Sequence, residues 1–329
     1  MAAREFPTAG GSAATGQTAI GAIDIGGTKI AVALLAADGS ILTKDEMPTD
    51  AARGFEVAMA GVCATLRSAI HRQGVELRGV GIGCTGPVDP FSGRIGSVEF
   101  LLGWNGCSPV DYLSAEFRVD VALENDADAA ALAEAAWGAG RGSKSLISVT
   151  VGTGIGGGIL LGGELYRGAQ GLHPEVGHHV IDPSGPQCFC GASGCWEALA
   201  SAPAMVSRFL ADRPGGTQVE GVTAMSICAR ARQADAAALH AVAIEARYLG
   251  LGIANLITLF APEAIVLSGN VMNSADLLLP GIRAVVEQSC GLVPASATRL
   301  AVSALGPEAP VIGAGAVWNY RIGRELRQC

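Results

Sequence analysis

The chain has 329 residues, a length that predicts about two domains, and half of them are hydrophobic, which is enough to bury a full core. Only 16% of the residues are charged, the net charge is −8, and no lysine- or arginine-rich block occurs, so neither nucleic acid nor an acidic membrane surface is an expected partner. Nine cysteines and the lack of a secretory signal predict a cytoplasmic protein with reduced thiols.

The first part of the chain predicts a sheet followed by helices. Residues 1–20 are mostly small and polar, and we interpret them as a disordered lead-in. Residues 22–44 alternate apolar positions around a glycine turn and the Asp38-Gly39 pair, which predicts three strands. A helix is expected over about 54–72, and a buried strand from 77 into a glycine–proline loop. Another strand ends at Glu124-Asn125, where an alanine-rich helix begins.

The second part repeats this pattern. Residues 145–168 read as strand, glycine loop, strand and Gly162-Gly163 turn, and a mainly helical region follows over 202–260. Its most apolar run, 248–260, is too short to span a bilayer and predicts a buried helix. A strand at 263–270 and a final helix from 309 complete the chain. We therefore predict two similar α/β halves, a smaller one of residues 21–124 plus 309–329 and a larger one of 125–308.

Two glycine loops are candidate phosphate sites. "DIGGTK" at 24–29 offers backbone amides, a threonine hydroxyl and a lysine, although an ordinary hairpin turn is the alternative. "GTGIGG" at 152–157 matches a dinucleotide fingerprint, but a strand and not a helix follows it. No Walker-type loop occurs. Two such loops in two similar halves predict a nucleotide held from both sides.

Asp126 is the candidate general base. It stands where a strand gives way to a helix, the usual place of active sites in α/β sheets. The alternative is that Asn125 or Asp126 only caps the helix, and both roles are compatible. The helix dipole is expected to keep the carboxylate ionised, so that it accepts the proton of a hydroxyl that attacks phosphorus.

Three cysteines lie within eight residues, at 188, 190 and 195, and two adjacent histidines precede them. Cys3His is a common zinc set, and the spacing leaves His178 and His179 as alternative fourth ligands. Three buried thiols or a redox pair are the other interpretation. Glu175 and Glu197 flank this loop, and either they are solvated surface residues or they bind the hydroxyls of a sugar.

Together these motifs resemble the ROK family, named for repressors, open reading frames and kinases. The resemblance covers nearly everything from Ala22 onward and is carried by "DIGGTK", "GCTGPVD", "ENDA", "GTGIGGG", "EVGH" and "CFCGASGCWE" in the family's order. It implies an α/β, actin-like ATPase (ribonuclease H-like) fold, with two similar domains around a nucleotide and sugar cleft. It also implies phosphoryl transfer from ATP to a sugar hydroxyl.

The resemblance assigns roles by motif match. Asp126 is then the general base, and His178, not His179, completes the zinc site with Cys188, Cys190 and Cys195. The phosphate and Mg²⁺ surroundings are Asp24, Gly26, Gly27, Thr28, Lys29, Thr153, Gly154 and Gly269. The sugar contacts are Gly86, Asn105, Asn125, Asp126, Glu175, His178 and Glu197. The zinc is expected to shape the sugar pocket only, so its loss should leave ATP binding nearly unchanged.

Three positions depart from the family pattern. Leu101 stands where glucokinase-like members carry a sugar-binding Asn, and Asn105 is the candidate replacement. Asp128 stands where Asn is commoner, and "SGN" at 268–270 replaces a more glycine-rich turn. Because only 23 residues precede Asp24, we expect no helix-turn-helix repressor domain.

The expected function is an ATP- and Mg²⁺-dependent hexose kinase that acts on the 6-hydroxyl of glucose, with a structural zinc ion and a homodimeric assembly. An N-acetylmannosamine or N-acetylglucosamine kinase is the first alternative. A sugar-sensing regulator without turnover is the second, and the presence of Asp126 argues against it.

Overall fold

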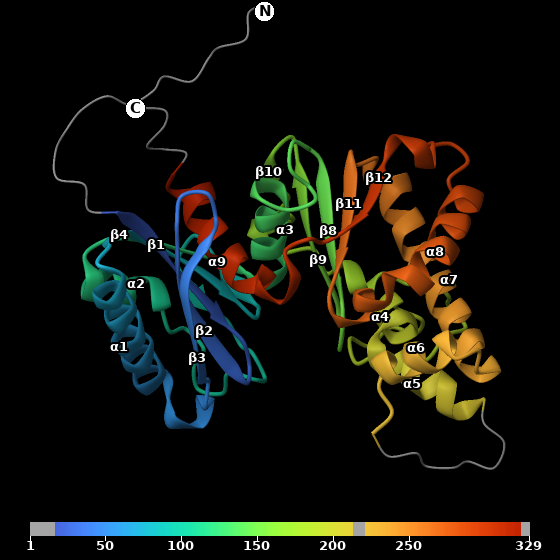
Figure 1. Cartoon of the computed structure of the whole chain (residues 1–329), viewed down its shortest axis with the longest axis horizontal. Helices are drawn as coiled ribbons and strands as arrows, with labels where there is room; N and C mark the ends of the chain where they lie inside the picture. The colour runs from blue at the N-terminus through green and yellow to red at the C-terminus, as the bar shows by residue number, and fades with distance from the viewer. Residues whose placement is uncertain (1–16, 213–220, 324–329) are drawn as a thin grey trace, which may run out of the picture.

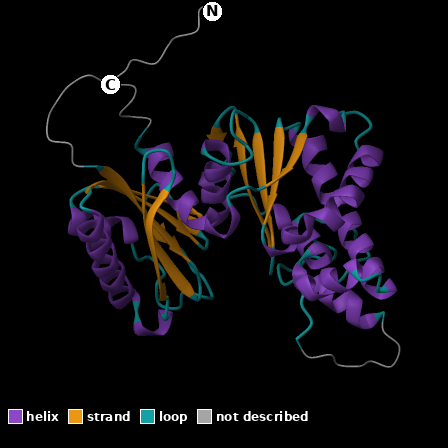
Figure 2. Cartoon of the chain, in the orientation of Figure 1, coloured by secondary structure: helices purple, strands orange, loops and turns teal. Residues whose placement is uncertain are grey.

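In the computed structural model, which describes residues 17–212 and 221–323, two five-stranded sheets lie side by side with helices between and outside them (Figures 1 and 2). The first sheet has the order β3-β2-β1-β4-β7 and the second β10-β9-β8-β11-β12. Both sheets therefore have one topology, as expected from the repeated sequence pattern.

All strands of the first sheet lie N-terminal to residue 126. Its parallel core joins β1, β4 and β7, while β2 and β3 extend it as antiparallel hairpins. A short ribbon of β5 and β6 follows β4. The strands are β1 (Thr18–Ile25), β2 (Lys29–Leu35), β3 (Ile41–Pro48), β4 (Glu76–Cys84), β5 (Val88–Asp89), β6 (Arg94–Ile95) and β7 (Asp120–Asn125).

The second sheet repeats this arrangement between residues 146 and 302. Its parallel core joins β8, β11 and β12, and β9 and β10 are the antiparallel extension. The strands are β8 (Leu146–Val151), β9 (Ile155–Leu161), β10 (Glu164–Leu165), β11 (Ala264–Ser268) and β12 (Arg299–Val302). The predicted domain boundaries remain a proposal.

The helices separate into three layers. Ile23 and Val32 face α1 on one side of the first sheet, and their neighbours Ala22 and Ala33 face α9 on the other. The side chains of alternate residues on the second sheet likewise face either α3 and α9 or the helices from α4 to α8. The helices are α1 (Phe55–Gln73), α2 (Pro109–Phe117), α3 (Asp126–Ala136), α4 (Trp196–Ala200), α5 (Ala202–Ala211), α6 (Ala224–Arg232), α7 (Ala236–Phe260), α8 (Ala275–Ser289) and α9 (Ala309–Arg321).

Helix α9 lies between the sheets although it is the last described helix of the chain (Figure 1). It packs closely on β4, because a Cβ at Gly81 would overlap the carbonyl oxygen of Ala314. The Trp318 indole donates a hydrogen bond to the carbonyl of Asp120 at 3.1 Å. Helix α9 thus covers one face of the first sheet; below, the first lobe means the first sheet with its packed helices, and the second lobe means the second sheet with its packed helices.

Helix α7 is long and apolar enough to cross a membrane by length and composition, but 56% of that apolar window is buried inside the protein. Leu249 and Ile253 are fully buried in the core of the second lobe. The sequence placed the apolar run in a buried helix, and that prediction is confirmed. The helix is longer than the run because it begins at Ala236.

One boundary was wrong. Residues 18–20 were assigned to the disordered lead-in but form the start of β1, because Ala19 and Ile20 are buried and pair with β4. The rest of the predicted lead-in, 1–16, and the end of the predicted C-terminal helix, 324–329, lie outside the described residues, as does 213–220.

Candidate functional site

The carboxyl ends of the parallel strands of the first sheet bring four predicted site residues together. In the sheet register Ile25 pairs with Cys84, and Cys84 with Asn125. Asp24 therefore lies one residue before the end of β1, and Asp126 begins α3 directly after β7. Gly86 lies against Asn125, since a Cβ at this glycine would be 2.7 Å from the amide Nδ2.

Asp126 and Asn125 both cap α3. The side-chain oxygen of Asn125 accepts a hydrogen bond from the Ala127 N–H at 2.9 Å, and Asp126 Oδ1 accepts one from the same group at 2.8 Å. Asp126 stays exposed. Capping was the simpler interpretation of this pair, and it holds beside any catalytic role.

The carboxyl groups of Asp24 and Asp126 lie near enough to each other at this edge of the sheet for their negative charges to repel. Desolvation by the surrounding protein raises the pKa of Asp126 above its ordinary value, and this outweighs the Ala127 amide, which lowers it. The amide at the helix terminus therefore lowers the pKa of Asp126 as expected, but burial has the larger effect on that pKa. Burial, followed by repulsion from Asp126, raises the pKa of Asp24 to about 7. A cation beside these groups would favour their charged forms.

The first glycine loop is held by its own lobe. The Gly26 N–H donates to the carbonyl of Lys29 at 3.0 Å, which closes the turn, and the Thr49 hydroxyl donates to the carbonyl of Gly26 at 2.7 Å. The Thr49 N–H donates to the carbonyl of Thr28 at 3.0 Å. Lys29 forms an exposed ion pair with Glu46 at 3.0 Å. Gly27 is pressed against the side chain of Phe100.

The second glycine loop is held by Glu197. Oε2 of Glu197 accepts a hydrogen bond from the Ile155 N–H at 2.8 Å. A Cβ at Gly154 would overlap this oxygen, so the contact requires glycine there. Thr153 at the tip of the loop is exposed, and Gly269, with a φ of 91°, lies against the carbonyl of Val151. The nucleotide residues predicted in the second lobe thus lie together.

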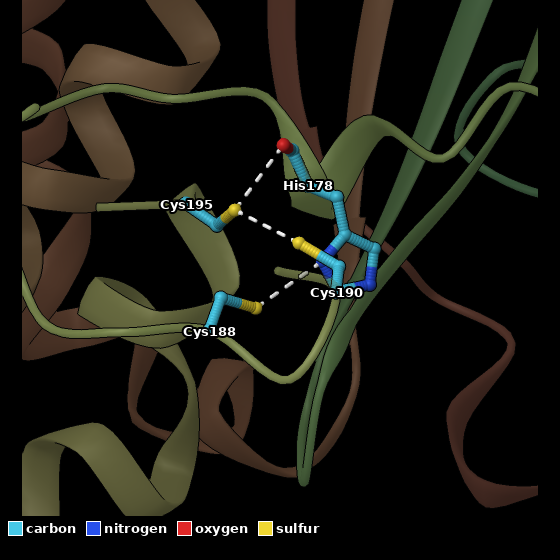
Figure 3. Close-up of side chains that lie close together, drawn as sticks. All are labelled: His178, Cys188, Cys190 and Cys195. Carbon is cyan, nitrogen blue, oxygen red and sulfur yellow. Dashed lines mark hydrogen bonds between the residues drawn. The ribbon is translucent and has the colours of Figure 1, made fainter. Parts of the chain in front are cut away.

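His178 and the three cysteines converge on one point (Figure 3). Their ligand atoms all lie within 4.8 Å of one another. Cys190 Sγ and Cys195 Sγ are 3.4 Å apart, and Cys188 Sγ is 3.5 Å from His178 Nδ1. Tetrahedral zinc with thiolate and imidazole ligands needs separations of about 3.5–3.8 Å, so the donor set fits zinc.

His179 is excluded from this cluster by its orientation. Its Nδ1 lies 2.6 Å from the carbonyl of Val176, and its ring packs against Trp196. Its Nε2 is buried with no partner among the described residues. Burial lowers the pKa of His179, as expected of a neutral ring in the interior.

The cluster is joined to the second glycine loop. Glu197 follows Cys195 by two residues, in the first turn of α4, and its Oε1 lies 4.0 Å from His178 Nε2. Trp196 anchors α4 by donating to the carbonyl of Tyr248 at 3.0 Å. The sequence analysis treated this loop as independent of the nucleotide region. The structure joins the two segments through the Glu197 carboxylate, and the independence of ATP binding stays a prediction.

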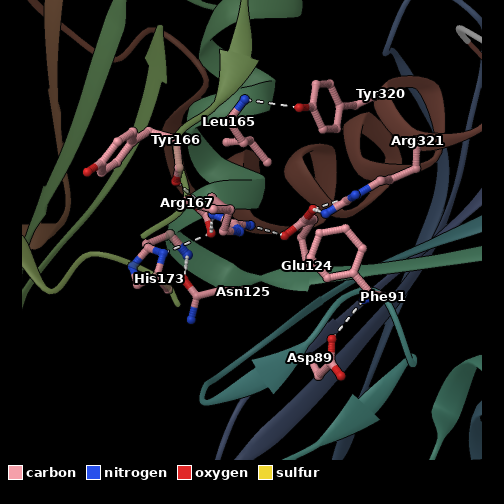
Figure 4. Close-up of polar contacts among 12 residues, drawn as sticks. Asp89, Phe91, Glu124, Asn125, Leu165, Tyr166, Arg167, His173, Tyr320 and Arg321 are labelled. Carbon is pink, nitrogen blue, oxygen red and sulfur yellow. Dashed lines mark hydrogen bonds and ion pairs between the residues drawn. The ribbon is translucent and has the colours of Figure 1, made fainter. Parts of the chain in front are cut away.

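A buried ion-pair network joins β7 and α3 to Arg167 and Arg321, and the sequence did not predict it (Figure 4). Glu124 and Asp128 are fully buried, and Arg167 pairs with both, through Nη1 to Asp128 at 2.6 Å. Arg321 Nε donates to Glu124 at 2.7 Å, and His173 Nδ1 lies 2.8 Å from Asp128 Oδ2. The unusual Asp128 was the available signal, since a buried carboxylate requires a cationic partner.

Asn105 is the predicted residue that the structure leaves apart. It is exposed, and within 17–212 and 221–323 no hydrogen bond or ion pair links it to the other predicted sugar contacts. Leu101 is buried in the first core together with Trp104. The missing amide at 101 is therefore replaced by a core side chain.

Comparison with known proteins identifies what the chain is similar to. The model of the ROK family matches residues 20–321. A glucokinase of Halalkalibacterium halodurans is 34% identical over 309 residues, 89% of this chain and 92% of the relative. An N-acetylmannosamine kinase of Escherichia coli is 35% identical, over 84% of this chain and 89% of the relative. The structure of a ROK family glucokinase from Streptomyces griseus, in complex with glucose and AMPPNP, superposes with a TM-score of 0.74 at 33% identity, over 90% and 98% of the two chains.

Proposed function

Because the chain belongs to the ROK family and has its actin-like ATPase fold, we propose that it is an ATP-dependent hexose kinase. The proposed reaction transfers the γ-phosphoryl group of ATP to the 6-hydroxyl of glucose or a related hexose. Asp126 is the proposed general base, which accepts the hydroxyl proton as the oxygen attacks phosphorus.

The single observation that carries the proposal is the position of Asp126. Its carboxylate is exposed at the start of α3, beside Asn125 and Gly86 and within electrostatic reach of Asp24 and Glu175. A capping residue alone would not need a second carboxyl group opposite it. The arrangement suits a hydroxyl held between the two carboxylates, with the phosphates beyond.

The two substrates have separate proposed contacts. For the sugar these are Gly86, Asn105, Asn125, Asp126, Glu175, His178 and Glu197, of which Asn105 has the weakest support. For ATP they are Asp24, Gly26, Gly27, Thr28, Lys29, Thr153, Gly154 and Gly269. Mg²⁺, when bound with the nucleotide near Asp24, neutralises phosphate charge.

The Cys3His cluster is the proposed zinc site, with His178, Cys188, Cys190 and Cys195 as ligands. Nδ1 of His178 faces the cysteines, and Nε2 faces Glu197. His178 is thereby oriented toward the sugar contacts, and zinc, when bound, supplies a rigid loop. Cytoplasmic location and a homodimer remain predictions.

The substrate itself has one specific competitor. N-acetylmannosamine or N-acetylglucosamine is the alternative, because the identity to the Escherichia coli kinase, 35%, is close to the 34% of the glucokinase and because Leu101 removes a glucose contact expected from the family. A regulator without turnover is disfavoured by the exposed carboxylate at Asp126.

A coupled ADP-release assay over glucose, mannose, fructose, N-acetylglucosamine and N-acetylmannosamine, with Mg²⁺ and after zinc analysis, tests the proposal. We expect sugar-dependent ADP release with at least one of them, and position 6 of the product should carry the phosphate by ³¹P NMR. Zinc-loaded, folded protein that releases no ADP with any of these sugars would instead support the regulator.

A further inference from the structure

His173 is held near the proposed general base by the buried carboxylate of Asp128. Asp128 lies on α3 one half-turn after Asp126, and its Oδ2 contacts both Arg167 Nη1 at 2.6 Å and His173 Nδ1 at 2.8 Å. Because the carboxylate can only accept, Nδ1 carries the hydrogen. Nε2 then has no hydrogen-bond partner within residues 17–212 and 221–323, although the His173 side chain is only 18% exposed. The ring is therefore fixed at one nitrogen and open at the other.

A protonated His173 would give the ion-pair network one positive charge more than it has negative charges. When ionised, Glu124 and Asp128 carry two negative charges, and Arg167 and Arg321 carry two positive charges that balance them. Desolvation lowers the pKa of His173, but its hydrogen bond to Asp128 and the charges of Asp128 and Glu175 outweigh this and leave the pKa above its ordinary value. The surplus positive charge is thus placed on the ring that borders Asp126.

The other groups that act on Asp126 cannot supply this charge. Carboxyl groups or a thiol face it from β1, β4, α3 and the segment before the Cys/His loop, and each of them either repels a negative charge or is neutral. In contrast, a charged His173 favours the carboxylate form of Asp126. The groups other than His173 are the side chains of Asp24, Cys84, Asp128 and Glu175 and the Ala127 N–H, a neutral donor that also lowers the pKa of Asp126.

We infer that His173 is a positioning residue for the proposed reaction, fixed by Asp128 and Arg167 so that its imidazolium keeps Asp126 ionised and ready to accept the sugar proton. This inference rests on the proposed function. His173 acts through Asp126 and is not itself assigned a bond to the substrate. The unusual acid at 128 has its purpose here, since it is the residue that orients the ring.

The pH dependence of kcat/KM tests the inference with the best sugar of the panel. His173→Asn keeps an N–H directed at Asp128 but removes the charge, so the pKa of Asp126 should rise and the acidic limb should move to higher pH. A shift of roughly half a pH unit or more is expected, at the lower end of the effect of a nearby charge. Asp128→Asn removes the partner that favours protonation of His173, but it also removes a negative charge that raises the pKa of Asp126, so its limb should move less than that of His173→Asn.

His240→Asn is the matched control. His240 Nδ1 lies 2.9 Å from Asp212 Oδ2, the same type of pair, but it is exposed and distant in the fold from α3. Its profile should coincide with that of the wild type. An equal shift in this control, or an unmoved limb in folded His173→Asn, overturns the inference, as does a loss of kcat that is the same at every pH.

Two further arms keep the outcomes apart. If the wild type is active, Asp126→Asn is inactive and the acidic limb of His173→Asn does not move, the role of His173 is rejected and the proposed function stands. If the wild type is inactive, both are rejected. If neither variant folds, NMR titration of the wild-type histidines decides. His173 should then titrate above the ordinary histidine value, and titration below it contradicts the inference.

Discussion

The two glycine loops occupy equivalent places in the two sheets but are held by different means. Loop 26–28 joins β1 to β2 and is held by Thr49, a buried residue at the end of the neighbouring strand β3. Loop 152–154 joins β8 to β9 and is held by Glu197, which belongs to the helix after the Cys/His cluster. The first loop depends only on its sheet, while the second depends on a distant segment of the chain.

This difference means that two sheets of the same topology connect their glycine loops to different parts of the protein. A neutral hydroxyl that binds a carbonyl inside the sheet stabilises the first loop, whatever is bound nearby. A carboxylate shared between the Ile155 amide and the neighbourhood of His178 links the second loop to the proposed sugar and zinc regions. Perturbation of the Cys/His segment should therefore reach the second loop and spare the first.

The largest effect should come from Asp126, the proposed general base. Asp126→Asn preserves the shape and the cap of α3, but an amide cannot accept the hydroxyl proton, so kcat should fall by about 10²–10⁴-fold. Steady-state kinetics beside nucleotide titration measures this, and the Kd for ATP should change little. Near-normal kcat would mean that Asp126 is only a cap.

A smaller effect is expected from the loop that Glu197 holds. Gly154→Ala places a Cβ on Glu197 Oε2 and should displace the carboxylate from the Ile155 amide. Since a hydrogen bond to a charged group contributes about 1.5–3 kcal/mol, kcat/KM should fall by roughly tenfold to a hundredfold. Gly152→Ala is the control, because a Cβ there meets nothing within 4 Å. Equal kinetics in the two variants would remove Glu197 from the explanation.

Loss of the metal should have an intermediate effect that is unequal between the loops. The purified protein should contain about one zinc per chain, and Cys190→Ser should lower that content. Sugar affinity should fall, and ATP affinity should also fall, but less than in Gly154→Ala because Glu197 keeps its amide partner. Calorimetric titration with each substrate measures both. Unchanged ATP affinity in metal-free, folded protein would restore the independence that the sequence suggested.

The smallest effect should come from the first loop. Thr49→Val removes the 2.7 Å hydrogen bond to the Gly26 carbonyl, and we expect a loss of about 1–2 kcal/mol in the free energy of unfolding. Metal content and sugar affinity should not change, because Thr49 contacts only its own lobe. Denaturant unfolding and zinc analysis check this, and a reduced zinc content would show that the two loops are coupled after all.

Much of the fold was predictable because its signals are local. Period-two alternation and the Asp38-Gly39 turn identified the first three strands, and the same pattern identified β8 and β9. Helix α8 had no such prediction, since Pro280 inside it works against a helical interpretation. Strand β12 has only four residues, so its period is too brief to recognise.

The site was predictable where the chemistry is contiguous. Cys188, Cys190 and Cys195 lie in one short segment, and their convergence with His178 needed no distant contact. The Arg167–Asp128–His173 chain could not be found in this way, because Asp128 lies 39 residues before Arg167 and 45 before His173, and they meet only after β9 and β10 fold back along α3. Spacing alone also did not decide between His178 and His179, which differ in the direction of their rings.

The late position of α9 in the chain has a consequence for how the protein is made. The first sheet is synthesised long before Val311 and Ala314, whose side chains cover the alanines on one of its faces. At a synthesis rate of about 5–20 residues per second, that apolar face waits for roughly 9–40 seconds after the sheet has left the ribosome. Both sheets receive this helix last, but the first sheet is translated earlier and its apolar face therefore stays uncovered for longer.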